Sequence, residues 1–460
     1  MISRTEKNKS ISIEKIYAIL VTIFCSITFV IQPIFSVPDE GTHFANAYEL
    51  FHQDTKNDNF SSYRIPNNID MYREFQFITS FTEKGDYNQD DLTLNLTSDK
   101  IQYIPSAVGM LVGQWIYPST GVILSFGRLF NAIFYAVVIY FAIKKAKFGQ
   151  WMMAAVALLP MSIQQAVSVS YDVFFYVTIF VGFSLITNLV TYQKRLNWKD
   201  YLPIFLVVCL CLLAKPSSRI MILYLVALPT SLLKPNIVTS FIDAIWNFFN
   251  RHRIVFVGLI LSVFLVFIQY FFKNYSGLSR GLQVLFNTFF RPEIKPDLDS
   301  ILTTGVIGNF GWLTHRLPEW FVIFDCIFLF LILVNEPKVK IQNRLVFTST
   351  MVIIGNIIMV SLTMFISWTI NVLNEYGLMY VSGEQGRYYT PFLICLIPLG
   401  IYLKRFITIE ISDLMMKRLF IMIMSINFVY FAILTLLFYY TDDGGMQFLV
   451  QFSTWVRDLF

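Results

Sequence analysis

Long apolar runs, separated by short polar loops, occupy most of the chain. Each run approaches the ~20 residues that a helix needs to cross a hydrocarbon core. The eleven runs lie at about 16–36, 122–143, 150–170, 173–192, 201–214, 219–233, 254–272, 319–335, 345–368, 388–403 and 418–438. None alternates apolar and polar residues over about ten positions, as a membrane barrel strand does. The pattern therefore predicts an all-α polytopic membrane protein with about eleven transmembrane helices.

The composition agrees with this prediction and excludes several other classes of protein. Hydrophobic residues make up 56% of the chain and charged residues only 14%, with a mean hydropathy of +0.59. The formal charge of +5 is spread over short loops and forms no basic stripe, so we expect no nucleic-acid partner. The five cysteines fall in or near apolar runs, where they act as small hydrophobic residues. The bilayer is thus the first predicted partner.

Lysines and arginines cluster in alternate short loops, which sets the predicted orientation because such residues favour the cytoplasmic side. The clusters are Lys144, Lys145 and Lys147; Lys194, Arg195 and Lys199; Lys234, Arg251 and Arg253; Lys338, Lys340 and Arg344; and Lys404, Arg405, Lys417 and Arg418. Residues 1–15 are basic too, and no small-residue cleavage site ends the first run, so we expect a cytoplasmic N-terminus and an uncleaved first span. The expected outer segments are 37–121, 171–172, 215–218, 273–318, 369–387 and the C-terminal tail. We interpret residues 1–460 as a single integral membrane domain.

Two segments depart from simple membrane crossings. The first outer loop, 37–121, is the longest, and its stretch 103–117 is apolar but short, which favours an interfacial or re-entrant helix. The runs 201–214 and 219–233 are also short, and Lys215-Pro216 separates them. Because irregular backbone at membrane depth is tolerated only beside protein or water, we expect this hairpin to line a cavity.

The sequence Val37-Pro38-Asp39-Glu40-Gly41-Thr42-His43-Phe44 follows the first apolar run directly. One interpretation is structural: a helix start with proline and two acids in its first turn. The other is chemical, because Asp39 and Glu40 lie four and three residues before His43 and would share a helix face with it. Such a group takes a proton from a hydroxyl or holds a divalent cation such as Mg²⁺ or Mn²⁺. We name Asp39, Glu40 and His43 as candidate catalytic residues.

Charged residues also occur at the predicted outer ends of the spans. Asp172 interrupts two runs, and the cations there are Arg128, Lys215, Arg219 and Arg387. A single arginine at a span end often only reaches towards the headgroups. Four outer cations oppose the usual charge bias, so we expect an anion such as a lipid phosphate to accompany them.

Two further loops carry candidate substrate contacts. The segment 305–318 combines glycines with Trp312 and His315, where a sugar ring could stack on the indole; an interfacial aromatic belt is the structural alternative. The segment 383–389 adds Gln385 and Tyr388 beside the arginine at position 387. The candidate substrate-binding residues are Arg387, Lys215, Arg219, Asp172, Trp312, His315, Gln385 and Tyr388.

These motifs together resemble a family of uncharacterised bacterial multi-spanning membrane proteins, known as a domain of unknown function, which is similar to the GT-C glycosyltransferases. The matching motifs are Pro38-Asp39-Glu40-x-x-His43-Phe44, Tyr171-Asp172, Lys215-Pro216, Gly308-x-x-Gly311-Trp312 with Pro318, and Gln385-Gly386-Arg387-Tyr388. The resemblance implies a GT-C-like bundle in the bacterial cytoplasmic membrane, with an acidic residue of the first outer loop at the position of Asp39. The chain departs from the family at Asn46, where an arginine is common.

The resemblance also implies an activity. We expect transfer of a sugar from a polyprenyl-phosphate donor to a cell-envelope glycan or lipid acceptor on the outer face, with Asp39 as base and Arg387, Lys215 and Arg219 at the phosphate. Trp312 and His315 would contact the sugar. A transporter or flippase of lipid-linked glycans is the alternative, and a structural subunit of an envelope complex is a third. Metalloprotease, serine hydrolase and nucleotide phosphate-loop motifs are absent from the sequence.

Overall fold

The computed structural model describes residues 11–52, 80–85, 92–294, 298, 300–337, 339–407 and 409–441, and within them almost all regular structure is helical. The single sheet of this described part is a two-residue antiparallel hairpin, β1 (Asn309–Phe310) and β2 (His315–Arg316). Most of the expected cytoplasmic segment 1–15 and of the polar stretch 54–100 lies outside the described residues. The all-α class predicted from the apolar runs is confirmed.

Within the described residues, six helices are long and apolar enough to cross a membrane. They are α1 (Ile13–Ile31), α6 (Thr120–Lys145), α9 (Asp172–Thr191), α13 (Arg253–Phe271), α17 (Asn343–Met364) and α19 (Asp413–Tyr440). A π-helical turn, η7 (Phe365–Ile370), extends α17. The polytopic character of the chain is therefore confirmed, whereas the number of eleven crossings stays a prediction.

The other five apolar runs are helical but shorter or broken. They correspond to α7 (Gln150–Leu158) with α8 (Pro160–Ala166), α10 (Trp198–Leu213), η3 (Pro216–Leu223) with α11 (Tyr224–Ala227) and η4 (Thr230–Leu232), α16 (Glu319–Asn335), and η8 (Gly386–Tyr388) and η9 (Thr390–Leu396) with α18 (Ile397–Leu403). Proline opens α8, η3 and η9 near their first positions. Because proline has no backbone N–H and disfavours helical backbone before it, each of these runs is interrupted there.

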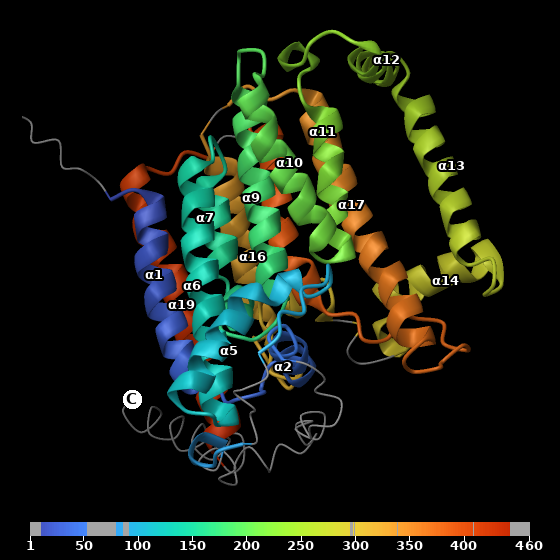
Figure 1. Cartoon of the computed structure of the whole chain (residues 1–460). Coiled ribbons are helices and arrows are strands. Elements are labelled where there is room, and N and C mark those ends of the chain that lie inside the picture. Colours follow the sequence, from blue (N-terminus) through green and yellow to red (C-terminus); the bar gives the residue numbers. More distant parts are fainter. Residues whose placement is uncertain are drawn as a thin grey trace, which may run out of the picture.

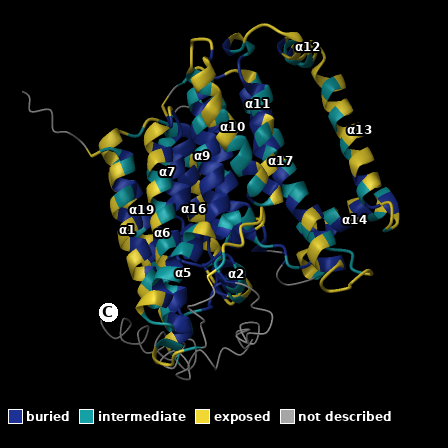
Figure 2. Cartoon of the chain, viewed as in Figure 1, coloured by how far each residue is buried: buried dark blue, intermediate teal, exposed yellow. Residues whose placement is uncertain are grey.

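The core lies between α7, α8 and α9, whose residues are almost all buried (Figure 2). Helices α1, α6, α16, α17 and α19 surround this centre, and Figure 1 shows them as one bundle. Helix α13 stands at one side of the bundle, between α12 (Ile237–Arg251) and α14 (Gly277–Phe290). Only 6% of the residues in its apolar stretch are buried. Its last turn joins a small core with the end of α17, through Ile268 and Phe365.

The first outer loop contains α2 (Glu40–Tyr48), η2 (Ile101–Tyr103) and α5 (Ile104–Ile116). The expected short apolar helix of this loop is α5, and it packs antiparallel to the first half of α6. A Cβ atom at Gly109 would lie 2.3 Å from the carbonyl oxygen of Phe126, so only glycine permits this approach. Phe44 and Tyr48 of α2 share a core with Ala107 of α5. This packing holds α2 at the end of the bundle.

The second large outer segment, 273–318, ends in three short elements. These are η5 (Pro292–Ile294), α15 (Thr304–Ile307) and the β1–β2 hairpin. Gly305 of α15 lies directly against Gly386 of η8: a Cβ atom at Gly386 would be 2.1 Å from the carbonyl carbon of Gly305. Two glycines thus bring the backbone of this segment into contact with the loop that carries Arg387.

Candidate functional site

Asp39 and Arg387, which are 348 residues apart in sequence, form an ion pair at the end of the bundle. Nη2 of Arg387 donates to Oδ2 of Asp39 at 3.0 Å. The Asp39 side chain is 39% exposed, whereas that of Arg387 is only 3% exposed. Asp39 precedes α2 with a φ of 64°, a left-handed conformation that aspartate tolerates better than most residues. The pair therefore presents one accessible carboxylate that a buried cation holds in place.

Asp172 joins this pair to Lys215. Nε of Arg387 lies 3.4 Å from Oδ2 of Asp172, and Nζ of Lys215 contacts its Oδ1. Asp172 starts α9, while Lys215 occupies the break between α10 and η3. The four residues Asp39, Arg387, Asp172 and Lys215 form one cluster, which we call the ion-pair cluster. The sequence analysis named all four, and the structure brings them together.

Aromatic rings surround the lysine of the ion-pair cluster. Nζ of Lys215 lies 4.0 Å from the ring centre of Tyr388, 4.6 Å from that of Tyr171 and 5.6 Å from that of Phe175. These faces stabilise an ammonium group through cation–π interactions. Burial lowers the pKa of Lys215 to about 8, although Asp172 acts in the opposite direction. Lys215 is thus a cation at neutral pH in a largely apolar setting, and Tyr388 is one wall of its cage.

His43 lies beside the ion-pair cluster and is held by tyrosines. Its Nδ1 is 2.8 Å from the Tyr103 hydroxyl, and its ring meets the edge of Tyr171 at 4.6 Å between centres. Burial lowers the pKa of His43 to about 4, with the nearby carboxylates of Asp172 and Asp39 opposing this. The imidazole is therefore neutral at pH 7. Tyr103 was missed in the sequence analysis, where it marked only the start of a short apolar helix.

The buried histidine predicts a pH-dependent stability. Because the pKa of His43 is about 4 in the fold against 6.5 for the free side chain, the unfolded chain binds more protons between these values. The free energy of unfolding should thus fall as pH drops from 6.5 to 4, by up to about 3 kcal/mol from this residue. His43→Gln should remove that part of the slope in thermal unfolding between pH 4 and 7. His252→Gln, at an exposed position, is the control and should keep the wild-type slope. Equal slopes for His43→Gln and wild type would contradict the assignment.

Glu40, which the sequence motif predicted to be catalytic, pairs with Arg128 and lies outside the ion-pair cluster. Its carboxylate receives two hydrogen bonds from Arg128, Nε at 2.8 Å and Nη2 at 2.5 Å, and a third from the backbone N–H of Val169 at 3.1 Å. Arg128 also donates to the carbonyl oxygens of Gln32 and Pro33, each at 2.8 Å. Glu40 is fully buried. This pair ties the end of α1 to α2, α6 and the segment before α9, which is a structural task.

Most of the outer cations pair with carboxylates of the protein itself. Arg128 pairs with Glu40, and both Lys215 and Arg387 pair with Asp172. Three of the four outer cations thus have carboxylate partners within the protein, whereas an accompanying lipid phosphate stays a prediction. Arg219 is exposed on η3 and forms no ion pair with the residues described here, so the structure does not bring it into the cluster.

The loop candidates lie near the cluster but have protein partners of their own. Nε1 of Trp312 donates to the carbonyl oxygen of Phe35 at 3.2 Å, and the side chain is about 40% exposed. His315 is buried, stacks on Phe438 at 4.6 Å and has a pKa that burial lowers to about 3. Gln385 directly precedes the helical turn η8 and faces a small pocket beside Arg387. Trp312 is thus partly accessible, whereas His315 is buried among aromatic rings.

The side chains of Asp39, Glu40 and His43 do not converge on one point as the ligands of a metal ion would. Among the described residues, no three side chains of His, Cys, Asp or Glu are grouped as ligands of one ion. The reason is local, since Glu40 turns to Arg128 while Asp39 turns to Arg387. The expected divalent site at Asp39, Glu40 and His43 therefore has no preformed ligand set.

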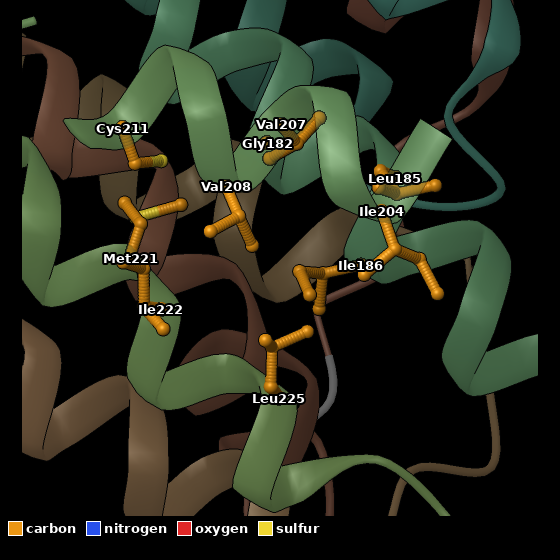
Figure 3. A pocket seen from close by; sticks show the side chains of 10 residues that line it. All are labelled: Gly182, Leu185, Ile186, Ile204, Val207, Val208, Cys211, Met221, Ile222 and Leu225. Carbon is orange, nitrogen blue, oxygen red and sulfur yellow. The ribbon is translucent and has the colours of Figure 1, made fainter. Parts of the chain in front are cut away.

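An apolar pocket lies between α9, α10 and the η3–α11 segment (Figure 3). Its volume is about 20 Å³, little more than the space of one water molecule. Figure 3 shows that its walls are aliphatic side chains, with sulfur atoms only from Cys211 and Met221. The pocket has no acid, base or cation, so it offers hydrocarbon packing and no chemistry. Cys211 lies four residues before Lys215, so the pocket starts close to the aromatic cage.

A family model described as "Predicted membrane protein (DUF2142)", a domain of unknown function, matches residues 22–396. The matched part includes all four residues of the ion-pair cluster. No curated protein and no solved structure matches the chain.

Proposed function

We propose that this chain, which belongs to the DUF2142 family of predicted membrane proteins, is a membrane glycosyltransferase. Its substrates would be a polyprenyl-phosphate-linked sugar and a cell-envelope glycan or lipid with a free hydroxyl group. The reaction would take place on the outer face of a bacterial cytoplasmic membrane, in a GT-C-like bundle of about eleven crossings with a cytoplasmic N-terminus. The resemblance of the motifs to that superfamily suggests the reaction class.

The observation that carries the proposal is the accessible Asp39 carboxylate in one cluster with a buried cation, Arg387, and a largely buried one, Lys215. An acid in this setting can act as a general base. Asp39 would accept the proton of the acceptor hydroxyl group. At the same time the oxygen of that hydroxyl group would form a bond to the anomeric carbon of the donor sugar. The bond from that carbon to the phosphate oxygen breaks, and the lipid phosphate leaves with the electron pair. The configuration at the anomeric carbon is inverted in such a direct displacement.

Arg387 and Lys215 would stabilise the leaving phosphate electrostatically. The contacts of Arg387 suggest how substrate binding and base exposure are coupled. A phosphate that bonds to Nη2 of Arg387 competes with Oδ2 of Asp39 for the same donor. Donor binding would thus release the carboxylate towards the acceptor at the moment when it is needed. Asp172 would keep both cations in position throughout, because it contacts each of them.

Neutral His43 and partly exposed Trp312 fit auxiliary roles. His43 with Tyr103 would hold the start of α2, and thereby Asp39, against the cluster. Trp312 would offer the accessible part of its side chain to a sugar. Binding by Arg and Lys requires no metal ion for phosphate neutralisation, while Mg²⁺ or Mn²⁺ brought in with a substrate would meet Asp39 first.

A transporter or flippase of lipid-linked glycans is the second candidate function. The observation that favours it is that Lys215 and Arg387 both contact the Asp172 carboxylate without a ligand, as in a carrier whose phosphate site closes when it is empty. Such a protein moves the lipid-linked sugar across the bilayer and leaves the bond between sugar and phosphate intact.

One experiment separates these two functions. The purified chain is reconstituted in liposomes that contain polyprenyl-phosphate sugars labelled in the saccharide, together with an extract of envelope lipids and glycans. We expect the label to move from the polyprenyl carrier to a second molecule, with release of polyprenyl phosphate. Label that changes leaflet but stays on the polyprenyl phosphate would support the transporter and overturn the transferase.

A further inference from the structure

A second pocket, lined mainly by uncharged groups, adjoins the ion-pair cluster. Its wall includes Pro38 and Arg387, so it starts where the Asp39–Arg387 pair ends. Its other polar lining consists of carboxamides: Gln164, Gln165, Asn309 and Gln385. They come from α8, from β1 and from the loop before η8, and are therefore far apart in sequence. We call this space the amide pocket.

Three oxygen atoms of the amide pocket are buried without a hydrogen-bond donor. They are Oε1 of Gln165, Oε1 of Gln385 and Oδ1 of Asn309. The side chains of Gln165 and Asn309 are 1% and 6% exposed. The amide nitrogen of Gln165 faces only the sulfur of Met161, at 4.0 Å. Buried carbonyl oxygens are nearly always paired in folded proteins, so three unpaired ones in one place indicate a missing donor.

The chemistry of that donor follows from the lining. Carboxamides carry no charge, and Arg387, the one cation among the lining residues, lies at the end of the pocket that meets the ion-pair cluster. A carboxylate, a phosphate or an ammonium group would find no counter-ion among the amides. Hydroxyl groups fit, because each both donates and accepts a hydrogen bond, as carboxamides do. Several hydroxyls at close spacing are the mark of a sugar.

From these contacts we infer that the amide pocket binds hydroxyl groups of the sugar whose phosphate lies at Arg387. The inference rests on the proposed function and deepens it, because it assigns an uncharged hexose as the donor saccharide. The free space inside the pocket is close to that of a single water molecule. Hydroxyl or hydroxymethyl substituents therefore enter it, while the ring and the anomeric carbon stay outside, beside Asp39. Gln165 and Gln385 are the specificity-determining residues.

Binding of soluble sugar phosphates tests this inference without any transfer reaction. Dissociation constants of the full-length protein in detergent are measured for inorganic phosphate and for the 1-phosphates of glucose, galactose and mannose. We expect at least one hexose phosphate to bind about tenfold more tightly than inorganic phosphate, as one or two added hydrogen bonds allow. Gln165→Met and Gln385→Met, which keep the side-chain length, should reduce this preference to near unity and leave phosphate affinity unchanged.

Gln114→Met is the matched control, because Gln114 is a glutamine of α5 that is buried as completely as Gln165 and lies outside the amide pocket. It should keep the wild-type preference. Each variant is first compared with wild type by its elution profile and its unfolding temperature, so that a misfolded protein is recognised. A wild-type protein that binds no hexose phosphate more tightly than phosphate overturns the inference. So does a preference that survives both substitutions, since the pocket would then hold only a buried water.

The outcome is distinguishable from failure of the proposed function. A hexose preference that Gln165→Met removes, in a protein that transfers no sugar, keeps the pocket and rejects the enzyme. Sugar transfer by wild type and by both variants with the same KM for the donor keeps the enzyme and rejects the pocket.

Discussion

Asp39→Asn is expected to lower the rate of sugar transfer by about 10²- to 10⁴-fold, the range that general-base catalysis supplies. Asparagine preserves the shape of the side chain and can still contact Arg387 through its oxygen, but it cannot accept a proton. Because Asp39 is partly exposed, the unfolding temperature should change little. The measurement is the initial rate of label transfer in liposomes at saturating donor, beside thermal unfolding of both proteins.

Glu49→Gln is the matched control for this substitution. Glu49 follows the same helix α2, is 31% exposed and pairs with Lys100 at 3.1 Å, so it is, like Asp39, a partly exposed acid at an end of α2 with a cationic partner. Its loss should leave the rate within about twofold of wild type, as for most substitutions at the surface. Arg387→Ala should abolish transfer as well. Wild-type rates in both Asp39→Asn and Arg387→Ala, with normal expression, would refute the proposed catalytic site.

Glu40→Ala should destabilise the fold by about 3–5 kcal/mol, because it leaves the buried guanidinium of Arg128 without its carboxylate. The two neighbouring acids should therefore differ in effect: the Glu40 substitution lowers the free energy of unfolding, whereas the Asp39 substitution lowers the rate of transfer. Thermal unfolding in a mild detergent, with wild type and Asp39→Asn measured in parallel, is the test.

Glu40→Met combined with Arg128→Met provides the control for the stability effect. An apolar pair of similar volume often replaces a buried ion pair at little cost. Recovery should be incomplete here, because Arg128 also donates to the carbonyl oxygens of Gln32 and Pro33. If Glu40→Ala instead unfolds like wild type and loses only transfer activity, Glu40 is a catalytic residue, as the sequence motif alone suggested.

The apolar periodicity was enough to predict where the helices lie, but not how long each one is. All eleven runs are helical in the structure, and in the part of the chain that it describes six of them contain a helix long and apolar enough to cross a membrane. Prolines at Pro160, Pro216 and Pro391 account for the breaks. The surface position of α13 was unpredictable, because an all-apolar helix looks the same in a core and in lipid.

The residues of the ion-pair cluster could be predicted from the sequence, but their individual contacts could not. Asp172, Lys215 and Arg387 stand out in the sequence because charged residues are rare within or beside apolar spans. The predicted topology puts all three on the same side of the membrane as Asp39. Which acid pairs with which cation does not follow from topology, because Asp39 and Glu40 are neighbours and only the left-handed turn at Asp39 points them apart. The sugar contacts assigned to His315 depended on residue type, and the core packing of that ring overrides it.

The separation of Asp39 from Arg387 has a consequence for biosynthesis. During translation the acid emerges with the first hydrophobic segment, whereas its arginine partner follows 348 residues later. A nascent polypeptide or a truncated fragment that ends between residues 39 and 387 therefore carries the acid without this cation. The ion pair can form only once the translocon has received nearly the entire chain.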